Sequence, residues 1–185
     1  MKRTKIFGIG FHKTGTKSLA AALKHFGYRV TGPNGARNPN IAREVREVAF
    51  ALLEQYDAFQ DNPWPILYQE LHQKCPAAKF ILTVRPSNSW IRSVVEHFGT
   101  KSTPMREWIY GIGFPRGHEE AYVARYERHN REVLDYFSDK PGRLLVVDIT
   151  AGEGWEKLCP FLGVDLPEAS FPCVNSAASR KLGTP

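Results

Sequence analysis

The residues of this chain best suited to chemistry begin with a glycine-rich loop near its start. Residues 8–19 read GIGFHKTGTKSL, and residues 13–18 of this run contain two lysines and three hydroxyl side chains. An apolar run typical of a strand precedes the loop, and a helix-like run follows it. A strand, a glycine loop and a helix N-terminus direct several backbone N–H groups at one point, where the helix dipole adds positive charge. The loop therefore predicts a site for a phosphate- or sulfate-like anion.

The loop differs from the nucleotide-binding loop of ATPases. That loop has a glycine, any four residues, and then Gly-Lys-Ser/Thr. Gly10 and Gly15 have the required spacing, but Thr16 stands where the lysine should follow, and Lys13 lies inside the loop. A plain strand-to-helix turn with its lysines in solvent is the other interpretation, and the density of basic and hydroxyl residues disfavours it.

A second candidate anion site follows the clearest strand pattern of the chain, the apolar run KFILTV at 79–84. Arg85 comes directly after this run, and Ser93 lies eight residues later in a helix-like segment. The planar guanidinium of arginine can hold two phosphate oxygens at once. Taken singly, Arg85 reads as a surface arginine and Ser93 as an ordinary helix residue. Their spacing behind a buried strand, downstream of the first loop, favours a functional pair.

The two motifs together resemble those of sulfotransferases. The run KTGTKSL at 13–19 is similar to the family's 5′-phosphosulfate loop, Lys-x-Gly-Thr-(Thr or basic)-x-Leu, in which the lysine stands two residues before the glycine, as Lys13 does. Arg85 and Ser93 match the family's arginine at a strand end and the serine eight residues on, which bind a 3′-phosphate. The resemblance implies transfer of a sulfuryl group from 3′-phosphoadenosine 5′-phosphosulfate (PAPS) to a hydroxyl or amine.

The resemblance also implies which residues hold the donor. Lys13 is expected to neutralise charge on the bridging oxygen between phosphate and sulfate, so that no metal ion is needed. The expected donor-binding residues are His12, Lys13, Thr14, Gly15, Thr16, Lys17, Ser18, Arg85, Ser93 and Arg180. Arg180 belongs to a weak match to the family's C-terminal Arg-Lys-Gly loop. Because Ser18 stands where many members have an adenine-stacking tryptophan, that contact is left to another aromatic residue, such as Trp64 or Phe98.

Asp61 is the candidate general base. Small-molecule sulfotransferases carry a His-x-Pro turn before the strand of the second motif, and this chain has Asp61-Asn62-Pro63 there. A carboxylate can act as base where burial raises its pKa. The alternative is that Asp61 only caps the turn, and both interpretations stay open. Weaker candidates are Glu70, His12, His97 and His118.

The elements that must position these residues alternate between strand and helix patterns. We predict strands at 4–10, 28–32, 57–61, 79–84 and 143–149, and helices at 16–27, 40–55, 66–74, 88–97, 118–138 and 152–163. Residues 99–117 are expected to form a lid or loop with at most one short helix. The alternation predicts one α/β domain over 1–185, with three layers and a central parallel sheet flanked by helices, similar to P-loop NTPases. The site should lie at the carboxyl ends of the strands.

The composition limits the partners. A formal charge of +6 suits a small anionic ligand, and no run of five basic residues indicates a nucleic-acid arm. Three scattered cysteines fit neither a disulfide framework nor a zinc site. No signal peptide is evident, and no apolar run approaches the ~20 residues of a membrane helix. We expect a cytoplasmic protein that acts on a small-molecule or carbohydrate hydroxyl, without nucleic-acid or membrane partners; the oligomeric state stays open.

Two other functions stay open. A small-molecule kinase would use ATP and Mg²⁺, with Lys17 and Ser18 as its loop pair and Asp148 as metal anchor. Asp148 has a simpler interpretation as a cap for the turn after its strand. A non-catalytic module for adenosine bisphosphates would need the same anion sites but no base.

Overall fold

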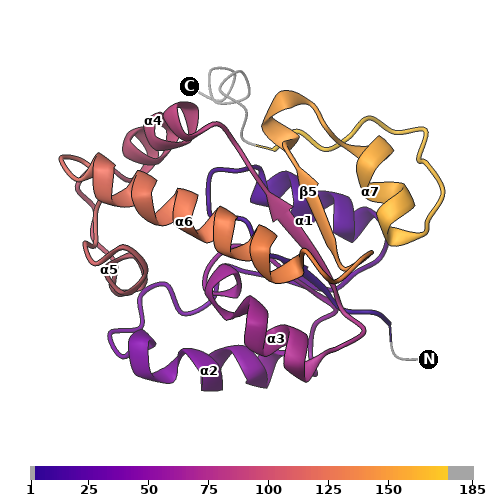
Figure 1. Ribbon diagram of the computed structural model, residues 1–185, viewed down its shortest axis with the longest axis horizontal. Coiled ribbons are helices and arrows are strands. Elements are labelled where there is room, and N and C mark those ends of the chain that lie inside the picture. Colours follow the sequence, from indigo (N-terminus) through magenta and orange to yellow (C-terminus); the bar gives the residue numbers. More distant parts are fainter. Residues whose placement is uncertain (1–2, 175–185) are drawn as a thin grey trace, which may run out of the picture.

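The protein has a parallel β-sheet between two layers of helices, seen in the computed structural model of residues 3–174 (Figure 1). The five strands are β1 (Ile6–Gly8), β2 (Val30–Thr31), β3 (Ala58–Phe59), β4 (Lys79–Thr83) and β5 (Leu144–Val147). Their order is β2-β3-β1-β4-β5, and every neighbouring pair is parallel. The predicted α/β class is therefore confirmed.

The helices follow the predicted alternation. They are α1 (Thr16–His25), α2 (Ile41–Leu52), α3 (Tyr68–Lys74), α4 (Ser87–Phe98), α5 (Pro104–Tyr110), α6 (Glu119–Phe137) and α7 (Trp155–Leu162). Two short 3₁₀ helices, η1 (Trp64–Leu67) and η2 (Ile149–Ala151), follow β3 and β5. The short helix α5 lies within the segment expected to be a lid or loop. The predicted strands were too long by one or two residues at one or both ends, because the sequence patterns run on into the segments that enter and leave each strand.

The side chains of the strands alternate between the two faces of the sheet and build two cores. On the face covered by α2 to α6, Phe7 pairs in register with Phe59 and Phe80, and its ring stacks on theirs at centroid distances of 4.9 Å and 5.4 Å. The opposite face packs against α1 and α7 through a smaller core that includes Ile6, Leu19, Leu23, Ala58, Ile81 and Leu158. Both faces are thus covered, as an all-parallel sheet requires.

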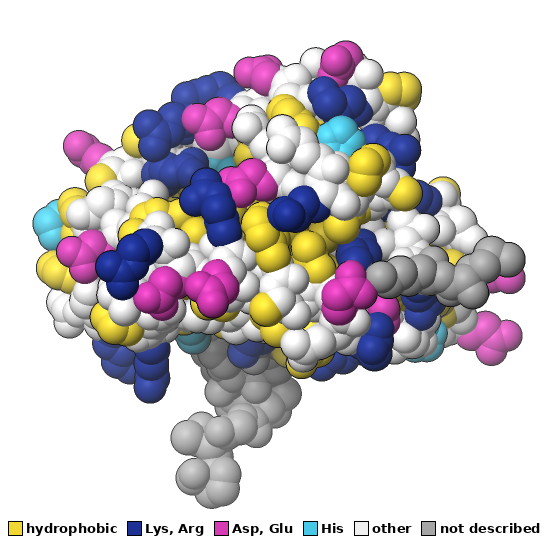
Figure 2. All heavy atoms as spheres, turned by 90° about the horizontal axis from the view of Figure 1, so that it is seen from below, with side chains coloured by type: hydrophobic (Ala, Val, Ile, Leu, Met, Phe, Trp, Pro, Cys, Tyr) yellow, Lys and Arg dark blue, Asp and Glu magenta, His cyan; other side chains and the backbone are white. Residues whose placement is uncertain are grey.

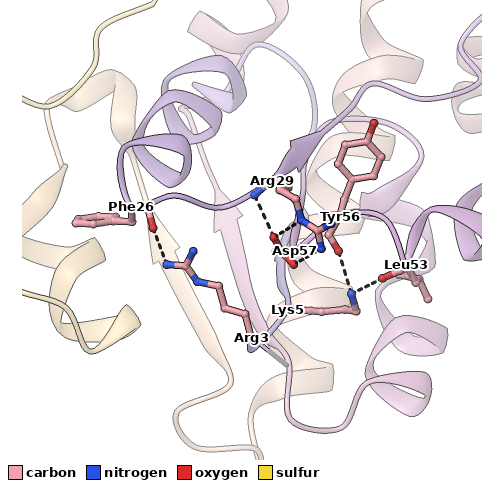
Figure 3. Close-up of polar contacts among 7 residues, drawn as sticks. All are labelled: Arg3, Lys5, Phe26, Arg29, Leu53, Tyr56 and Asp57. Carbon is pink, nitrogen blue, oxygen red and sulfur yellow. Dashed lines mark hydrogen bonds and ion pairs between the residues drawn. The ribbon is translucent and has the colours of Figure 1, made fainter. Parts of the chain in front are cut away.

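At the amino ends of the strands, cations are paired with a carboxylate and with backbone carbonyls (Figure 3). Arg29 holds Asp57 through three bonds, Nε to Oδ2 at 2.8 Å, Nη2 to Oδ1 at 2.9 Å and the backbone N–H to Oδ2 at 3.2 Å. Lys5 Nζ donates to the carbonyl of Tyr56 at 2.9 Å and to that of Leu53. These bonds join the segments that enter β1, β2 and β3, so this edge of the sheet is closed by the protein's own groups.

The molecular surface mixes charges of both signs. On the face seen in Figure 2, basic and acidic side chains are interspersed around exposed hydrophobic ones. Within residues 3–174, none of the helices has both the length and the apolar character needed to cross a membrane.

Candidate active site

Three predicted site segments follow three adjacent strands. The Lys13 loop follows β1, the Asp61 turn follows β3, and Arg85 follows β4, and β1 pairs with both β3 and β4. From β1 the chain crosses through α1 to the edge strand β2, whereas β4 and β5 lie on the other side of β1. The connections therefore run in opposite directions from β1, which makes its carboxyl end a switch point of the sheet. In open parallel sheets, ligands bind outside the carboxyl ends of the strands at such a point. The topology therefore brings the two predicted motifs to one place.

Glycines allow the loop after β1 to run close to its neighbours. A Cβ at Gly10 would lie 2.0 Å from Thr83 Oγ1, and one at Gly15 would lie 2.8 Å from Ile149 Cβ. Gly15 also has a left-handed backbone, with φ of 94°, directly before the first helical residue, Thr16. A left-handed residue followed by a helical one turns successive N–H groups toward one side and forms an anion-binding concavity. The geometry of the loop thus fits an anion.

The N-termini of α1 and α4 differ from those of the other α-helices. Neither has a side-chain cap bond or an acidic residue in its first turn. By contrast, α2, α3, α5, α6 and α7 each carry at least one glutamate in the first turn. Acidic side chains are favourable there because they complement the helix dipole. In α1 and α4, which follow the neighbouring strands β1 and β4, no acidic side chain of the helix itself complements the dipole. The carboxylates at their first residues come from other elements, Asp61 at Thr16 and Glu127 at Ser87.

Arg85 joins the two motifs. Its Nη1 donates to the backbone carbonyl of Lys13 at 3.3 Å, and its Nε donates to Ser89 Oγ at 3.0 Å. The hydroxyl of Tyr126 accepts from the Arg85 N–H at 2.9 Å and donates to the Arg85 carbonyl at 2.8 Å. Ser93 is buried one turn beyond Ser89 on α4. The guanidinium is therefore held against the anion loop.

The hydroxyl groups of the loop have different surroundings. Thr14 is fully buried, and its Oγ1 shares a hydrogen bond of 2.6 Å with Thr83 Oγ1, so this side chain anchors the loop to β4. Ser18 Oγ accepts from the backbone N–H of Val174 at 3.0 Å, which leaves its own proton available to a ligand. Lys17 is exposed in the first turn of α1. Arg180 lies outside the described residues.

Asp61 lies beside this loop in the turn after β3. Its Oδ2 accepts from Thr16 Oγ1 at 3.4 Å, and its Oδ1 accepts from the N–H of Asn62 at 2.7 Å. Burial raises the pKa of the carboxyl above its ordinary value, although these hydrogen bonds and the charges of Lys17 and Lys13 oppose the rise. A carboxyl with a raised pKa beside the loop suits a general base. Its bond to Asn62 also suits the turn interpretation.

His12 belongs to the loop, but its imidazole packs among the rings of Trp90, Phe98 and Tyr110. Burial, together with the charges of Arg106, Lys13 and His97, lowers the pKa of His12 to about 3. A neutral ring adds no positive charge for an anionic donor. The predicted donor contact of His12 therefore depends on its backbone.

The structure also bears on the interpretations of Asp148 and Trp64. Asp148 Oδ1 accepts from the N–H groups of Thr150 and Ala151, so it caps η2, which is the simpler of the two interpretations. Within residues 3–174, no three His, Cys, Asp or Glu side chains gather in a way that could hold a metal ion. Trp64 is fully buried against Phe7 and Phe59, which makes it a core residue and excludes it as an adenine partner.

The residues that hold the two motifs in place were missed from the sequence. Thr83 anchors Thr14, the indole N–H of Trp90 donates to the His12 carbonyl at 2.8 Å, and Tyr126 holds Arg85. Each contact joins residues more than forty positions apart, as in the 78 positions between His12 and Trp90. For Tyr126, the sequence predicted only that it lies in a helix at 118–138.

Two open hollows, of about 650 Å³ and 550 Å³, flank α6. None of the predicted site residues lines either of them. Neither hollow is therefore part of the candidate site.

Comparison with known proteins gives the family. Ava biosynthesis cluster protein M from Aspergillus versicolor is 27% identical over 207 aligned positions, which cover 91% of this chain and 79% of that protein. The crystal structure of a sulfotransferase from Alicyclobacillus acidocaldarius has a similar fold, with a TM-score of 0.60 and 17% identity over 98% of this chain and 90% of that chain. A family model described as sulfotransferase domain matches residues 5–180. Since that match spans nearly the whole chain, the protein belongs to the sulfotransferase domain family.

Proposed function

We propose that this protein transfers a sulfuryl group from PAPS to a hydroxyl group of a small-molecule or carbohydrate acceptor. The observation that carries the proposal is the pair of uncapped helix N-termini, α1 and α4, joined by the bond from Arg85 to the Lys13 carbonyl. PAPS has anionic groups at both its 5′ and 3′ positions and needs two neighbouring anion sites. ATP and ADP have no 3′-phosphate for the second one.

The residues of the first loop suit the 5′ end of the donor. Gly15 and the first turn of α1 offer backbone N–H groups, and Lys17 and Ser18 add charge and a hydroxyl proton. Bound there, PAPS supplies an activated sulfuryl group, whose bond to phosphate breaks as the acceptor oxygen bonds to sulfur, which leaves adenosine 3′,5′-bisphosphate. Lys13 neutralises the charge that develops on the leaving oxygen. Arg85 and Ser93 hold the 3′-phosphate.

Asp61 is the proposed base. Its carboxylate takes the proton of the attacking hydroxyl, and Thr16 orients it through the hydrogen bond to Oδ2. The raised pKa makes Asp61 a stronger base than an exposed aspartate. The cytoplasmic location, the single domain over 1–185 and the absence of nucleic-acid partners stay predictions.

Calorimetric titration tests the donor. Adenosine 3′,5′-bisphosphate should bind at least about tenfold more tightly than ADP, the difference expected for one charge-assisted contact to the 3′-phosphate. Its affinity should not change when Mg²⁺ is added. Tight ATP binding that requires Mg²⁺ would contradict the proposal and support the kinase.

A transfer assay tests the reaction. Radiolabelled PAPS is incubated with a phenol probe, 2-naphthol, and with a panel of sugars, and labelled sulfate esters are measured. Ester formation is expected with at least one hydroxyl probe. Tight bisphosphate binding with no transfer across a broad panel would favour the non-catalytic module instead.

A further inference from the structure

The loop after β2 packs directly against the turn that carries Asp61. Gln60 Nε2 donates to the carbonyl of Gly32 at 2.9 Å. A Cβ at Gly32 would lie 1.8 Å from the Gln60 carbonyl oxygen, so the two loops approach too closely for any side chain at this position. Residues 32–40 have no part in the proposed chemistry, yet they border the proposed base.

Asn34 makes three hydrogen bonds within this contact. Its backbone N–H donates to the carbonyl of Asn62 at 2.9 Å, and its Oδ1 accepts from Trp64 Nε1 at 3.0 Å. Its Nδ2 donates to Thr31 Oγ1 at 3.0 Å, at the end of β2. Asn34 thus binds the Asp61 turn on both sides of Pro63. A carboxamide suits the position because one side chain must both accept and donate.

The turn needs such support. Asp61 has a left-handed backbone, with φ of 62°, which is uncommon for a residue other than glycine. Conformations of this kind persist only where surrounding contacts hold them. Trp64, which is fully buried, and Asn34 supply contacts from the core side, while Thr16 supplies one from the anion loop.

We propose that Asn34 is a positioning residue that holds the Asp61 turn in place, so that the half-buried carboxyl stays beside Thr16 and the loop after β1. Asn34 acts through Asp61 and need not touch donor or acceptor. The kinetic consequence of the inference rests on the proposed function, whereas its effect on the Asp61 carboxyl does not.

The Asp61 carboxyl can be observed directly by carbon-13 NMR over a pH titration. In Asn34→Ala, the pKa of Asp61 should fall toward its ordinary value, because a loosened turn exposes the carboxyl to water. Thr31→Val keeps the shape of the side chain but removes the oxygen to which Asn34 Nδ2 donates, so it should lower that pKa in the same direction by less. Asn38→Ala is the matched control, since Asn38 lies in the same loop and bonds Glu44 and Asn40 instead. It should leave the pKa of Asp61 unchanged.

The same variants are then compared in the transfer assay with 2-naphthol and sugars. For Asn34→Ala we expect kcat to fall about tenfold, the effect of losing one or two buried hydrogen bonds, with unchanged affinity for adenosine 3′,5′-bisphosphate. Asn38→Ala should keep the wild-type kcat.

The outcomes separate the two proposals. If Asn34→Ala and Thr31→Val leave the pKa of Asp61 where it is, or if Asn38→Ala shifts it equally, Asn34 is not a positioning residue. If the pKa shifts as expected but the wild-type protein transfers no sulfate, the proposed function fails and the positioning role stands. Should Asn34→Ala not fold, Thr31→Val decides, because it loosens Asn34 without adding charge or removing its bond to Trp64.

Discussion

Two aspartates flank strand β3 at opposite ends of the sheet, and their surroundings differ. Asp57, before the strand, is held by three hydrogen bonds from Arg29, which lower its pKa to about 2. Asp61, after the strand, accepts from a threonine hydroxyl and a backbone N–H, and burial raises its pKa. The same side chain is thus a weak base at one end of a two-residue strand and a stronger base at the other.

The difference between the two aspartates reflects a difference between the amino edge and the carboxyl edge of the sheet. At the amino edge, Arg29, Lys5 and Asp57 satisfy one another or nearby carbonyls, which closes the fold (Figure 3). At the carboxyl edge, two helix N-termini lack acidic residues, and Arg85 is bound to a neutral carbonyl. Positive charge that no carboxylate of the same helix neutralises is available to an anionic ligand. The four predictions below test this division.

The largest effect is expected from Lys13→Ala. Removal of the charge that stabilises the leaving oxygen should lower kcat for sulfate transfer by about 10²- to 10³-fold. Calorimetric affinity for adenosine 3′,5′-bisphosphate should change little, because backbone N–H groups still hold the 5′-phosphate. Lys24→Ala is the control, because Lys24 lies in the last turn of α1, the helix that follows the loop, and this variant should keep full activity. Retained turnover in Lys13→Ala would refute the assigned role.

The variants Asp61→Asn and Asp57→Asn test whether the two aspartates that flank β3 differ in their contribution to the rate of sulfate transfer. Loss of a general base typically lowers kcat by about 10²-fold or more, so Asp61→Asn should lose that much. Asp57→Asn should transfer sulfate at the wild-type rate, because its carboxylate serves the fold. As pH falls through the raised pKa of Asp61, the wild-type kcat should decrease, and Asp61→Asn should lack this decrease. An intact rate in Asp61→Asn would make Asp61 a turn residue only.

Arg85→Ala tests the second anion site alone. A charge-assisted hydrogen bond contributes about 1.5–3 kcal/mol, so the preference for adenosine 3′,5′-bisphosphate over adenosine 5′-monophosphate should fall by about 10- to 100-fold. Arg92→Ala is the control, since Arg92 is an exposed arginine on the same helix, α4. Equal losses in both variants would indicate general electrostatic attraction instead of a 3′-phosphate contact.

The smallest effect concerns stability, and its sign should differ between the two aspartates. Asp57 has a lowered pKa, so its stabilisation is present above its ordinary value of 3.8 and is lost as pH falls toward about 2. Asp57→Asn should therefore lower Tm at pH 7 by no more than about 4 °C, with the difference vanishing in acid.

Asp61 should behave in the opposite way. Because its folded-state pKa is raised, the protein is stabilised by the protonated carboxyl at low pH and loses that stabilisation as pH rises through the raised value. Asp61→Asn should then raise Tm at pH 8 and have less effect in acid. Thermal melts of both variants from pH 8 down to about pH 2, the lowered pKa of Asp57, check the pair. Shifts of the same sign would show that the two sites do not differ as described.

The local patterns of the chain predicted most of the fold and the parts of the site. Strand and helix periodicities are short-range, and the loop at 8–19 carries its own glycines, lysines and hydroxyl residues within a few positions. The spacing of Lys13 from Gly15, and of Arg85 from Ser93, could be recognised in the sequence because each pair lies within one strand-loop-helix unit. Strand ends were less predictable, since β1 ends at Gly8 although apolar residues continue and Ile9 N still donates to the Ile81 carbonyl of β4 at 2.8 Å.

The contacts that join these parts could not be read in this way. Arg85 meets the Lys13 carbonyl across 72 positions, and Asp61 meets Thr16 across 45, because the strand order places β3 and β4 on either side of β1. The sequence did not predict a role for Asn34, because that role depends on how the loop after β2 packs against the Asp61 turn.

The sequence by itself determined that a loop rich in glycine, lysine and hydroxyl residues, a basic strand end and an Asp-Asn-Pro turn exist, each in its local element. Only the tertiary structure decided that they share one edge of the sheet. It also decided that Asp61 is bound to a threonine hydroxyl while Asp57 is bound to an arginine. The physical reason is that a pKa and a binding site depend on distances and solvent exposure, and chain segments far apart in sequence set both.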